Sequence, residues 1–245
     1  MPLKIRVVWV LCCIGIFIGF IYFNMMNQMR VHKEQKQLAA EQTQKRTEDK
    51  QKRQETKAQF VEMMVQVQEL NALGKRAGAA KLASQAVALE PRNAKARTWW
   101  GLSLVKAGKT SEALEKFDQS SRLDPNQTKN YYYWGLALLL DGHSEQAIDK
   151  FENALLLDPE NSKAYASWGV ALNQLGKYDE AIKRLQEALA QNSFNQQAYG
   201  VLVDAHFHKG QYQQAWEVVA RAHKNKITIS QASLNRLSDA SPKPG

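Results

Sequence analysis

Cysteine is almost missing from this chain of 245 residues, and its two copies, Cys12 and Cys13, stand side by side near the N-terminus. Residues 14–245 hold none, which excludes disulfides and thiolate metal sites there. The sequence also lacks a phosphate-binding glycine loop, a G-x-S-x-G elbow and an H-E-x-x-H helix. His206 and His208 are two residues apart, a spacing that turns them to different faces of a helix. We therefore expect no catalytic, metal or cofactor site and predict that the chain is not an enzyme.

A concentrated excess of one charge is missing too, although the formal net charge is +9. Residues 24–59 hold nine Lys or Arg against five Asp or Glu, whereas residues 128–161 hold two against six. A dedicated nucleic-acid binder presents one basic face, so no specific nucleic acid is expected as a partner. A basic lipid- or nucleic-acid-binding protein is thus the weakest functional alternative.

The longest apolar run covers residues 7–23 and follows a short basic tail over residues 1–6. As a helix it extends ~26 Å, the short end of the transmembrane range. The polar residues after it offer no small-x-small cleavage site, which favours an uncleaved anchor over a signal peptide. Basic residues on its two sides nearly balance, and the short basic tail favours a cytosolic N-terminus. The sequence predicts a single-pass protein of the bacterial inner membrane, with its remaining part in the periplasm.

Residues 24–59 form a Gln- and Lys-rich stretch without Gly or Pro, which favours a solvated stalk that is helical or partly disordered. Val31 and Leu38 are a heptad apart, but Lys45 and Lys52 follow in that register. A coiled coil is therefore not expected on these residues. The basic residues nearest the apolar run are candidates for contact with anionic lipid.

Four columns of residues recur every 34 positions from residue 60 onward. The columns are Gly74, Gly108, Gly142, Gly176 and Gly210; Ala79, Ala113, Ala147, Ala181 and Ala215; Ala86, Ser120, Ala154, Ala188 and Ala222; and Pro91, Pro125 and Pro159. Such a period indicates one supersecondary unit copied along the chain and stacked on itself. The five units cover residues 60–93, 94–127, 128–161, 162–195 and 196–229. Each is predicted to hold two helices, with the glycine in the turn between them and the proline ending the second.

The unit resembles the tetratricopeptide repeat, which is most complete in the third copy. That copy reads Tyr131-x2-Trp134-Gly135-x2-Leu138, then Ala147-x3-Phe151, then Pro159. The resemblance implies an all-α, right-handed solenoid, here preceded by the transmembrane helix and the charged stalk. Trp100, Trp134, Trp168, Phe117 and Phe151 are then packing residues. Residues 230–245 are expected to form a capping helix and a loose tail.

The resemblance also implies that the first helix of each unit lines a concave surface. On this register the partner-binding residues are Lys95, Trp99 and Leu102 of the second unit, Lys129, Tyr132, Tyr133 and Leu136 of the third, and Lys163 of the fourth. Thr98 and Ser167 belong to the same predicted face. The three lysines should form one edge beside an apolar and aromatic groove, which suits a helical or extended peptide with acidic flanks. Thr98 and Leu102 stand where some relatives hold a terminal carboxylate with Lys and Asn, so that kind of tail receptor is disfavoured.

The function these features favour is that of a membrane-anchored adaptor, which binds or organises partner proteins through its concave groove. The alternative of a different class is a structural subunit built permanently into a larger membrane complex. The two differ on purification, because an adaptor gives a stable soluble domain and a structural subunit aggregates without its complex.

Overall fold

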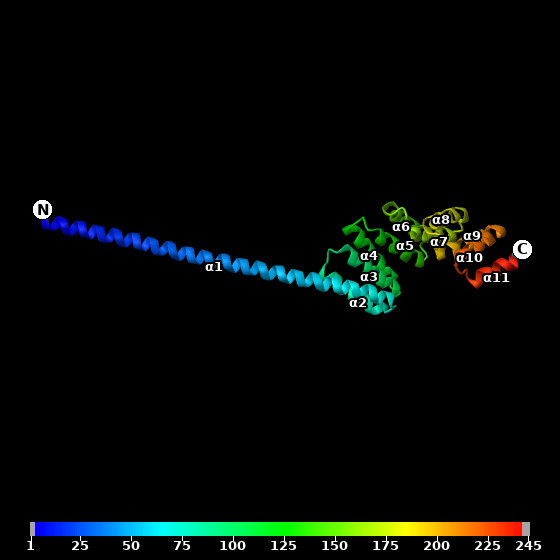
Figure 1. Ribbon diagram of the computed structural model, residues 1–245, viewed down its shortest axis with the longest axis horizontal. Coiled ribbons are helices and arrows are strands. Elements are labelled where there is room, and N and C mark those ends of the chain that lie inside the picture. The colour runs from blue at the N-terminus through cyan, green and yellow to red at the C-terminus, as the bar shows by residue number, and fades with distance from the viewer. Residues whose placement is uncertain (1–2, 242–245) are drawn as a thin grey trace. The chain divides into compact units, whose positions relative to one another are not determined.

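The computed structural model describes the backbone of residues 3–241 and the side chains of residues 15–241 (Figure 1). Within these limits the chain contains eleven helices and no strand. The helices are α1 Leu3–Ala72, α2 Arg76–Leu89, α3 Ala94–Lys106, α4 Thr110–Leu123, α5 Thr128–Leu140, α6 Ser144–Leu157, α7 Ser162–Gln174, α8 Tyr178–Gln191, α9 Gln196–His208, α10 Tyr212–Lys224 and α11 Gln231–Ala240. They form two units, Met1–Gln59 and Phe60–Gly245. Every buried side chain among the described residues lies in the second unit.

The first unit is a single stretch of α1, and its described side chains from Gly15 to Gln59 are exposed or, at Thr56, half-buried. Phe20 and Phe23, for example, expose 63% and 68% of their surface. No described residue outside this helix covers them, so packing does not account for the helix here. The absence of Gly and Pro from residues 24–59 agrees with the helix observed over them.

The predicted transmembrane helix over residues 7–23 is wrong on the part of the chain that the structure describes. None of the helices there is both long enough and apolar enough to cross a bilayer. A span requires about 20 apolar residues, whereas polar Asn24 follows the run directly and Asn27 and Gln28 come soon after it. This finding also contradicts the predicted single-pass anchor, the predicted inner-membrane location and the periplasmic assignment. The side chains of residues 7–14 lie outside the described residues.

In the second unit, consecutive helices pair into hairpins, and each pair stacks on the next. α3 packs on α4, α5 on α6, α7 on α8, and α9 on α10, while α2, α4, α6 and α8 each also contact the helix that follows. α2, α4 and α6 end two residues before Pro91, Pro125 and Pro159, as the proline column predicts. The stack of two-helix units that the period predicts is thus confirmed, and the described residues of these units are all-helical, as the resemblance implies.

The turn glycines adopt the backbone conformation that the sequence predicts. Gly108 and Gly142 have φ of 78° and 81°, and the other three members of the column lie between 69° and 72°. Other residues reach this region only with strain, because their Cβ approaches the backbone. The turn conformation therefore explains why this column alone keeps glycine in every copy.

The small-residue columns lie at the contacts between helices. All ten members of the two columns on the second helices are completely buried. A second kind of close contact involves Gly135, because a Cβ built there would lie 2.6 Å from the ring of Phe151. Gly101 faces Phe117 in the same way at 2.7 Å. These contacts confirm that Phe117 and Phe151 are packing residues, and they show that Gly101 and Gly135 make room for the two rings.

The tryptophans of the repeat are half-buried and each carries a cation over its ring. Lys116 lies 4.7 Å from the Trp100 ring centroid, Lys150 lies 4.3 Å from that of Trp134, and Arg184 lies 3.9 Å from that of Trp168. These cations are also 34 residues apart, so the contact repeats with the fold. The cations cover the outer faces of rings whose inner faces join the core.

The last hairpin is covered by α11, which contacts both α9 and α10. Ser230 caps this helix by accepting a hydrogen bond from the backbone N–H of Ser233. Leu237 is fully buried, and the indole N–H of Trp216 donates to the Ser241 carbonyl. The tail predicted at residues 242–245 lies outside the described residues.

Candidate functional site

The first helices of successive repeats lie side by side in the second unit. α3 contacts α5, α5 contacts α7, and α7 contacts α9 (Figure 1). Because helices of one kind are neighbours, their outward faces join into one surface that crosses several repeats. We call the part of this surface on α3, α5 and α7 the groove face.

A pocket of about 650 Å³ opens at the N-terminal ends of α3 and α5. The turns that follow α4 and α6 complete its wall. It is lined by Lys95, Thr98, Trp99, Asp124, Asn126, Gln127, Thr128, Lys129, Tyr133, Asp158 and Asn161. The structure thus brings four of the predicted partner-binding residues together: Lys95, Trp99, Lys129 and Tyr133.

An aromatic series leads from the pocket into the core. The ring centroids of Trp99 and Tyr133 are 6.3 Å apart, and those of Tyr133 and Tyr132 are 5.4 Å apart. Tyr132 in turn lies 6.3 Å from the fully buried Phe151. Burial raises the pKa of both tyrosine hydroxyls above the usual value near 10. Both therefore remain neutral at physiological pH, and Trp99 and Tyr133 offer the pocket half-buried rings.

Charges of both signs line the pocket, but they are engaged differently. Lys95 and Lys129 are exposed, and neither takes part in an ion pair among the described residues. Asp124 instead accepts a hydrogen bond from the backbone N–H of Asn126 at 3.0 Å. Asp158 accepts one from the Asn161 side chain at 3.1 Å. The carboxylates thus hold the inter-repeat turns, and the two ammonium groups are the ones available to a ligand.

The other four predicted site residues lie outside this pocket. Tyr132 and Leu136 are half-buried and pack against the core cluster around Leu138 and Phe151. Leu102 is half-buried on α3, and Lys163 is exposed at the start of α7. Tyr132 therefore supports the fold as well as the groove face.

Thr98 was expected on the groove face, but its hydroxyl belongs to a buried polar network. It lies 2.8 Å from the Ser120 hydroxyl and donates to the side-chain oxygen of Asn130 at 3.0 Å. Ser120 donates to the Ala94 carbonyl, and the Asn130 amide donates to the Phe117 carbonyl. The network joins α3, α4 and α5, so Thr98 stabilises the stack and only borders the pocket. Ser167, expected on the same face, is also fully buried.

Sequence reasoning missed the polar residues of the inter-repeat turns. Asp124 and Asp158 precede two prolines of the 34-residue column, so an Asp-Pro pair repeats with the period. Asn93, Asn161 and Asn195 also follow the period, and each caps a first helix by accepting from the backbone N–H three residues later. These columns were visible in the sequence and would have pointed to the turns as one wall of the pocket.

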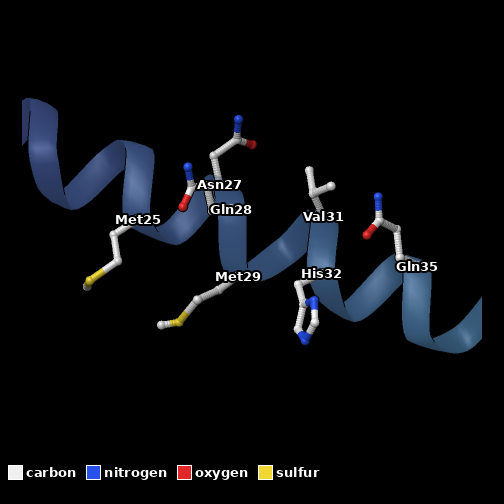
Figure 2. A pocket seen from close by; sticks show the side chains of 7 residues that line it. All are labelled: Met25, Asn27, Gln28, Met29, Val31, His32 and Gln35. Carbon is white, nitrogen blue, oxygen red and sulfur yellow. The ribbon is translucent and has the colours of Figure 1, made fainter.

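A second hollow, of about 550 Å³, lies along α1 in the first unit. Met25, Met29 and His32 project from one side of the helix, whereas Gln28, Val31 and Gln35 project from the other (Figure 2). All belong to one helix, which cannot enclose a ligand by itself. Over the residues that the structure describes, no group of three His, Cys, Asp or Glu side chains is placed to hold a metal ion.

Solved structures share the fold of the repeats at low identity. PilF of Pseudomonas aeruginosa matches at 17% identity with a TM-score of 0.64, over 74% of this chain and 83% of its own. A thermophilic tetratricopeptide protein of Thermus thermophilus matches at 21% and 0.61, over 74% and 98%. MamA of Desulfovibrio magneticus, from residue 41 to its end, matches at 19% and 0.60, over 67% and 93%. No curated protein sequence matches the chain.

Three family profiles match the chain, and each is described as tetratricopeptide repeat. They cover residues 65–128, 128–161 and 172–225, which together exceed half of the chain. The matches fall between the end of α1 and α10, where the turn glycines and the buried alanines recur. The chain therefore belongs to the tetratricopeptide repeat family.

Proposed function

We propose that this protein is an adaptor that holds a segment of a partner protein against the groove face. The repeat fold is that of a protein-interaction scaffold, which supports binding rather than catalysis as its role. The observation that carries the proposal is the pocket, which combines the rings of Trp99 and Tyr133 with the ammonium groups of Lys95 and Lys129.

Each class of residue has a different part in the proposed binding. Half-buried aromatic rings desolvate an apolar side chain of the partner, and such anchors commonly dominate binding energy. Lys95, Lys129 and Lys163 stand at the start of α3, α5 and α7 and attract acidic residues beside that anchor. Leu102, Tyr132 and Leu136 extend the apolar surface between them. The favoured partner segment is therefore apolar or aromatic with acidic neighbours.

A quantitative pull-down with the full chain tests this proposal. Trp99→Ala combined with Tyr133→Ala should weaken capture of its partners by about 2 kcal/mol or more, roughly 30-fold. Leu156→Ala is the matched control, because it removes an apolar side chain that is 76% exposed on the second helix α6. Helicity by circular dichroism should stay near wild type in both.

The lysines are tested by the salt dependence of the same capture. Lys129→Glu should reduce capture more at low than at high ionic strength, because the lost attraction is between exposed charges. Capture that survives loss of both aromatic rings, or that falls equally in Leu156→Ala, would remove the groove face as the binding surface.

A further inference from the structure

Six glutamates on α1 are spaced seven residues apart without a slip. They are Glu34, Glu41, Glu48, Glu55, Glu62 and Glu69, and all are exposed. A seven-residue repeat on a helix places its members along one line when the helix pairs with another in a coiled coil. In the heptad abcdefg we assign these glutamates to position e.

Beside the glutamates runs an uncharged stripe that alternates steps of three and four. It begins with Gln37, Ala40, Gln44 and Thr47 and continues in the same steps to Val65, Gln68 and Ala72. These are the a and d positions of the register, and no Asp, Glu, Lys or Arg occupies any of them. Val61 and Val65 of the stripe are 59% and 58% exposed. An uncharged a/d stripe in so charged a segment is the pattern of a seam between helices.

The charged residues on the other flank of the stripe have the opposite sign. Position g carries Lys36, Lys50 and Lys57. In a parallel pair, each g residue faces the e residue five positions later on the other helix, so Lys50 meets Glu55 and Lys57 meets Glu62. In an antiparallel pair, g faces g and e faces e, which sets Lys against Lys and Glu against Glu. The charges therefore select a parallel partner with this same sequence.

The charges that flank the stripe form no ion pair among the described residues. None of the ion pairs there includes the three lysines or the five glutamates from Glu41 to Glu69, whereas Glu34, which lies before the stripe, pairs with Arg30. Glu48 and Glu55 instead accept hydrogen bonds from Gln44 and Gln51 of the stripe, at 2.9 and 3.1 Å. The seam is mostly polar, so the association it supports is reversible rather than permanent.

The heptad register that argued against a coiled coil in the sequence analysis differs from the register assigned here. Val31, Leu38, Lys45 and Lys52 occupy position b, which faces away from a seam at a and d. Their lysines are therefore compatible with pairing, and the two apolar residues of that column are incidental to it.

We infer that α1 pairs in parallel with α1 of a second copy of this chain, along the a/d stripe from Gln37 to Ala72. The chain is then a dimer with two groove faces, and a partner with two matching segments gains apparent affinity from binding both. The inference does not depend on the groove, since it concerns only self-association.

Disulfide crosslinking of the full chain tests the seam. In a Cys12→Ser/Cys13→Ser background, Gln51→Cys places a thiol at position a, where two parallel helices bring identical residues together. Asp49→Cys places it at position f, on the outer face. We expect mild oxidation to link two 27.8 kDa chains through Gln51→Cys and not through Asp49→Cys. A non-ionic detergent masks the exposed apolar residues before Asn24.

Exchanging the charges at positions e and g tests whether the partner is a second copy of this chain in parallel orientation. One variant carries Lys50→Glu and Lys57→Glu, the other carries Glu55→Lys and Glu62→Lys, and both carry Gln51→Cys. Each alone sets like charges against each other and should lose about tenfold or more of its crosslinked dimer, whereas mixing the two should restore it. Failure of Gln51→Cys to crosslink, equal crosslinking through Asp49→Cys, or undiminished self-association of either charge variant overturns the inference. None of these readouts involves partner capture, so failure of the groove proposal is distinguishable.

Discussion

The two units of this molecule are helical for different reasons. From Phe60 to residue 229, helices are short and bury alanine or aromatic side chains, and the sequence repeats every 34 residues because the packing does. From Gly15 to Gln59, one helix runs without burying any side chain, and its sequence repeats every seven residues at its glutamates and uncharged positions. The comparison teaches that the length of a sequence repeat indicates which kind of helix contact the repeated residues make. The first period is satisfied within the chain, whereas the second has the spacing of the dimer proposed above.

The largest contrast between the units should come from removing one aromatic ring. Phe151 is fully buried, so Phe151→Ala should lower the free energy of unfolding by about 3–5 kcal/mol. Phe23→Ala, in the first unit, removes a ring that is 68% exposed and should change it by less than about 0.5 kcal/mol. Chemical denaturation followed by circular dichroism measures both. A large loss in Phe23→Ala would show that the first unit has a core of its own.

The next largest difference in stability between the units should come from adding a single methyl group. Gly135→Ala drives its new Cβ into the Phe151 ring, 2.6 Å away, and should cost about 1–3 kcal/mol. Gly19→Ala meets no atom within 4 Å and should instead favour the helix by about 1 kcal/mol. Melting curves for the first and peptide-level helicity for the second provide the readouts. Equal tolerance at the two sites would contradict the close packing of α5 on α6.

A hydroxyl comparison probes the buried network. Thr98→Val removes the hydroxyl that donates to the Asn130 side-chain oxygen and contacts the Ser120 hydroxyl. The buried Asn130 oxygen then lacks its donor, which should cost about 1–3 kcal/mol. Thr43 hydrogen-bonds only to the Ala39 carbonyl of its own helix, and its side chain is exposed. Thr43→Val should therefore be nearly neutral in the same denaturation experiment. If Thr98→Val were neutral as well, a water or a rearranged side chain would be replacing its hydroxyl.

The smallest effect expected concerns pH. Burial raises the folded-state pKa of Tyr132 and Tyr133, so between the unfolded value near 10 and the raised values the folded chain holds more protons. Their contribution to stability is fully present below pH 10 and is lost as the pH rises through the folded values. Tyr132→Phe with Tyr133→Phe should flatten that decline, which thermal melts between about pH 9 and 11.5 would show. An unchanged decline would assign it to other groups.

Much of the repeat unit could be predicted from the sequence because its contacts recur. The positions of Gly142 and Ala147 hold glycine and alanine in all five copies. The glycine has a positive φ in every copy, and the alanine is completely buried in every copy. Thr98 was misplaced because the repeat register locates a residue only on a helix face. Thr98 is buried because its hydroxyl contacts Ser120 of α4 and Asn130 of α5. The spacing of residues along the sequence does not predict a contact among three side chains from three helices.

The first unit was harder to predict, since an exposed helix has no packing partner to identify it. The membrane helix was predicted from the apolar run at residues 7–23, the basic tail before it and the lack of a cleavage site after it, but no described helix is long and apolar enough to cross a bilayer. The stalk was judged from Val31 and Leu38 because they are its conspicuous apolar residues. The informative residues were the glutamates, whose sevenfold spacing depends on a second helix that one chain does not contain.

Hydrogen–deuterium exchange on the full chain, with and without a captured partner, tests the binding account most directly. The account predicts slower exchange in the peptides of α3 and α5, around Lys95–Trp99 and Lys129–Tyr133. Peptides of α4 and α6 on the second helices should be unchanged. Protection confined to α4 and α6, or to residues 24–59, with α3 and α5 unaffected, would contradict it and place the binding surface elsewhere on the molecule.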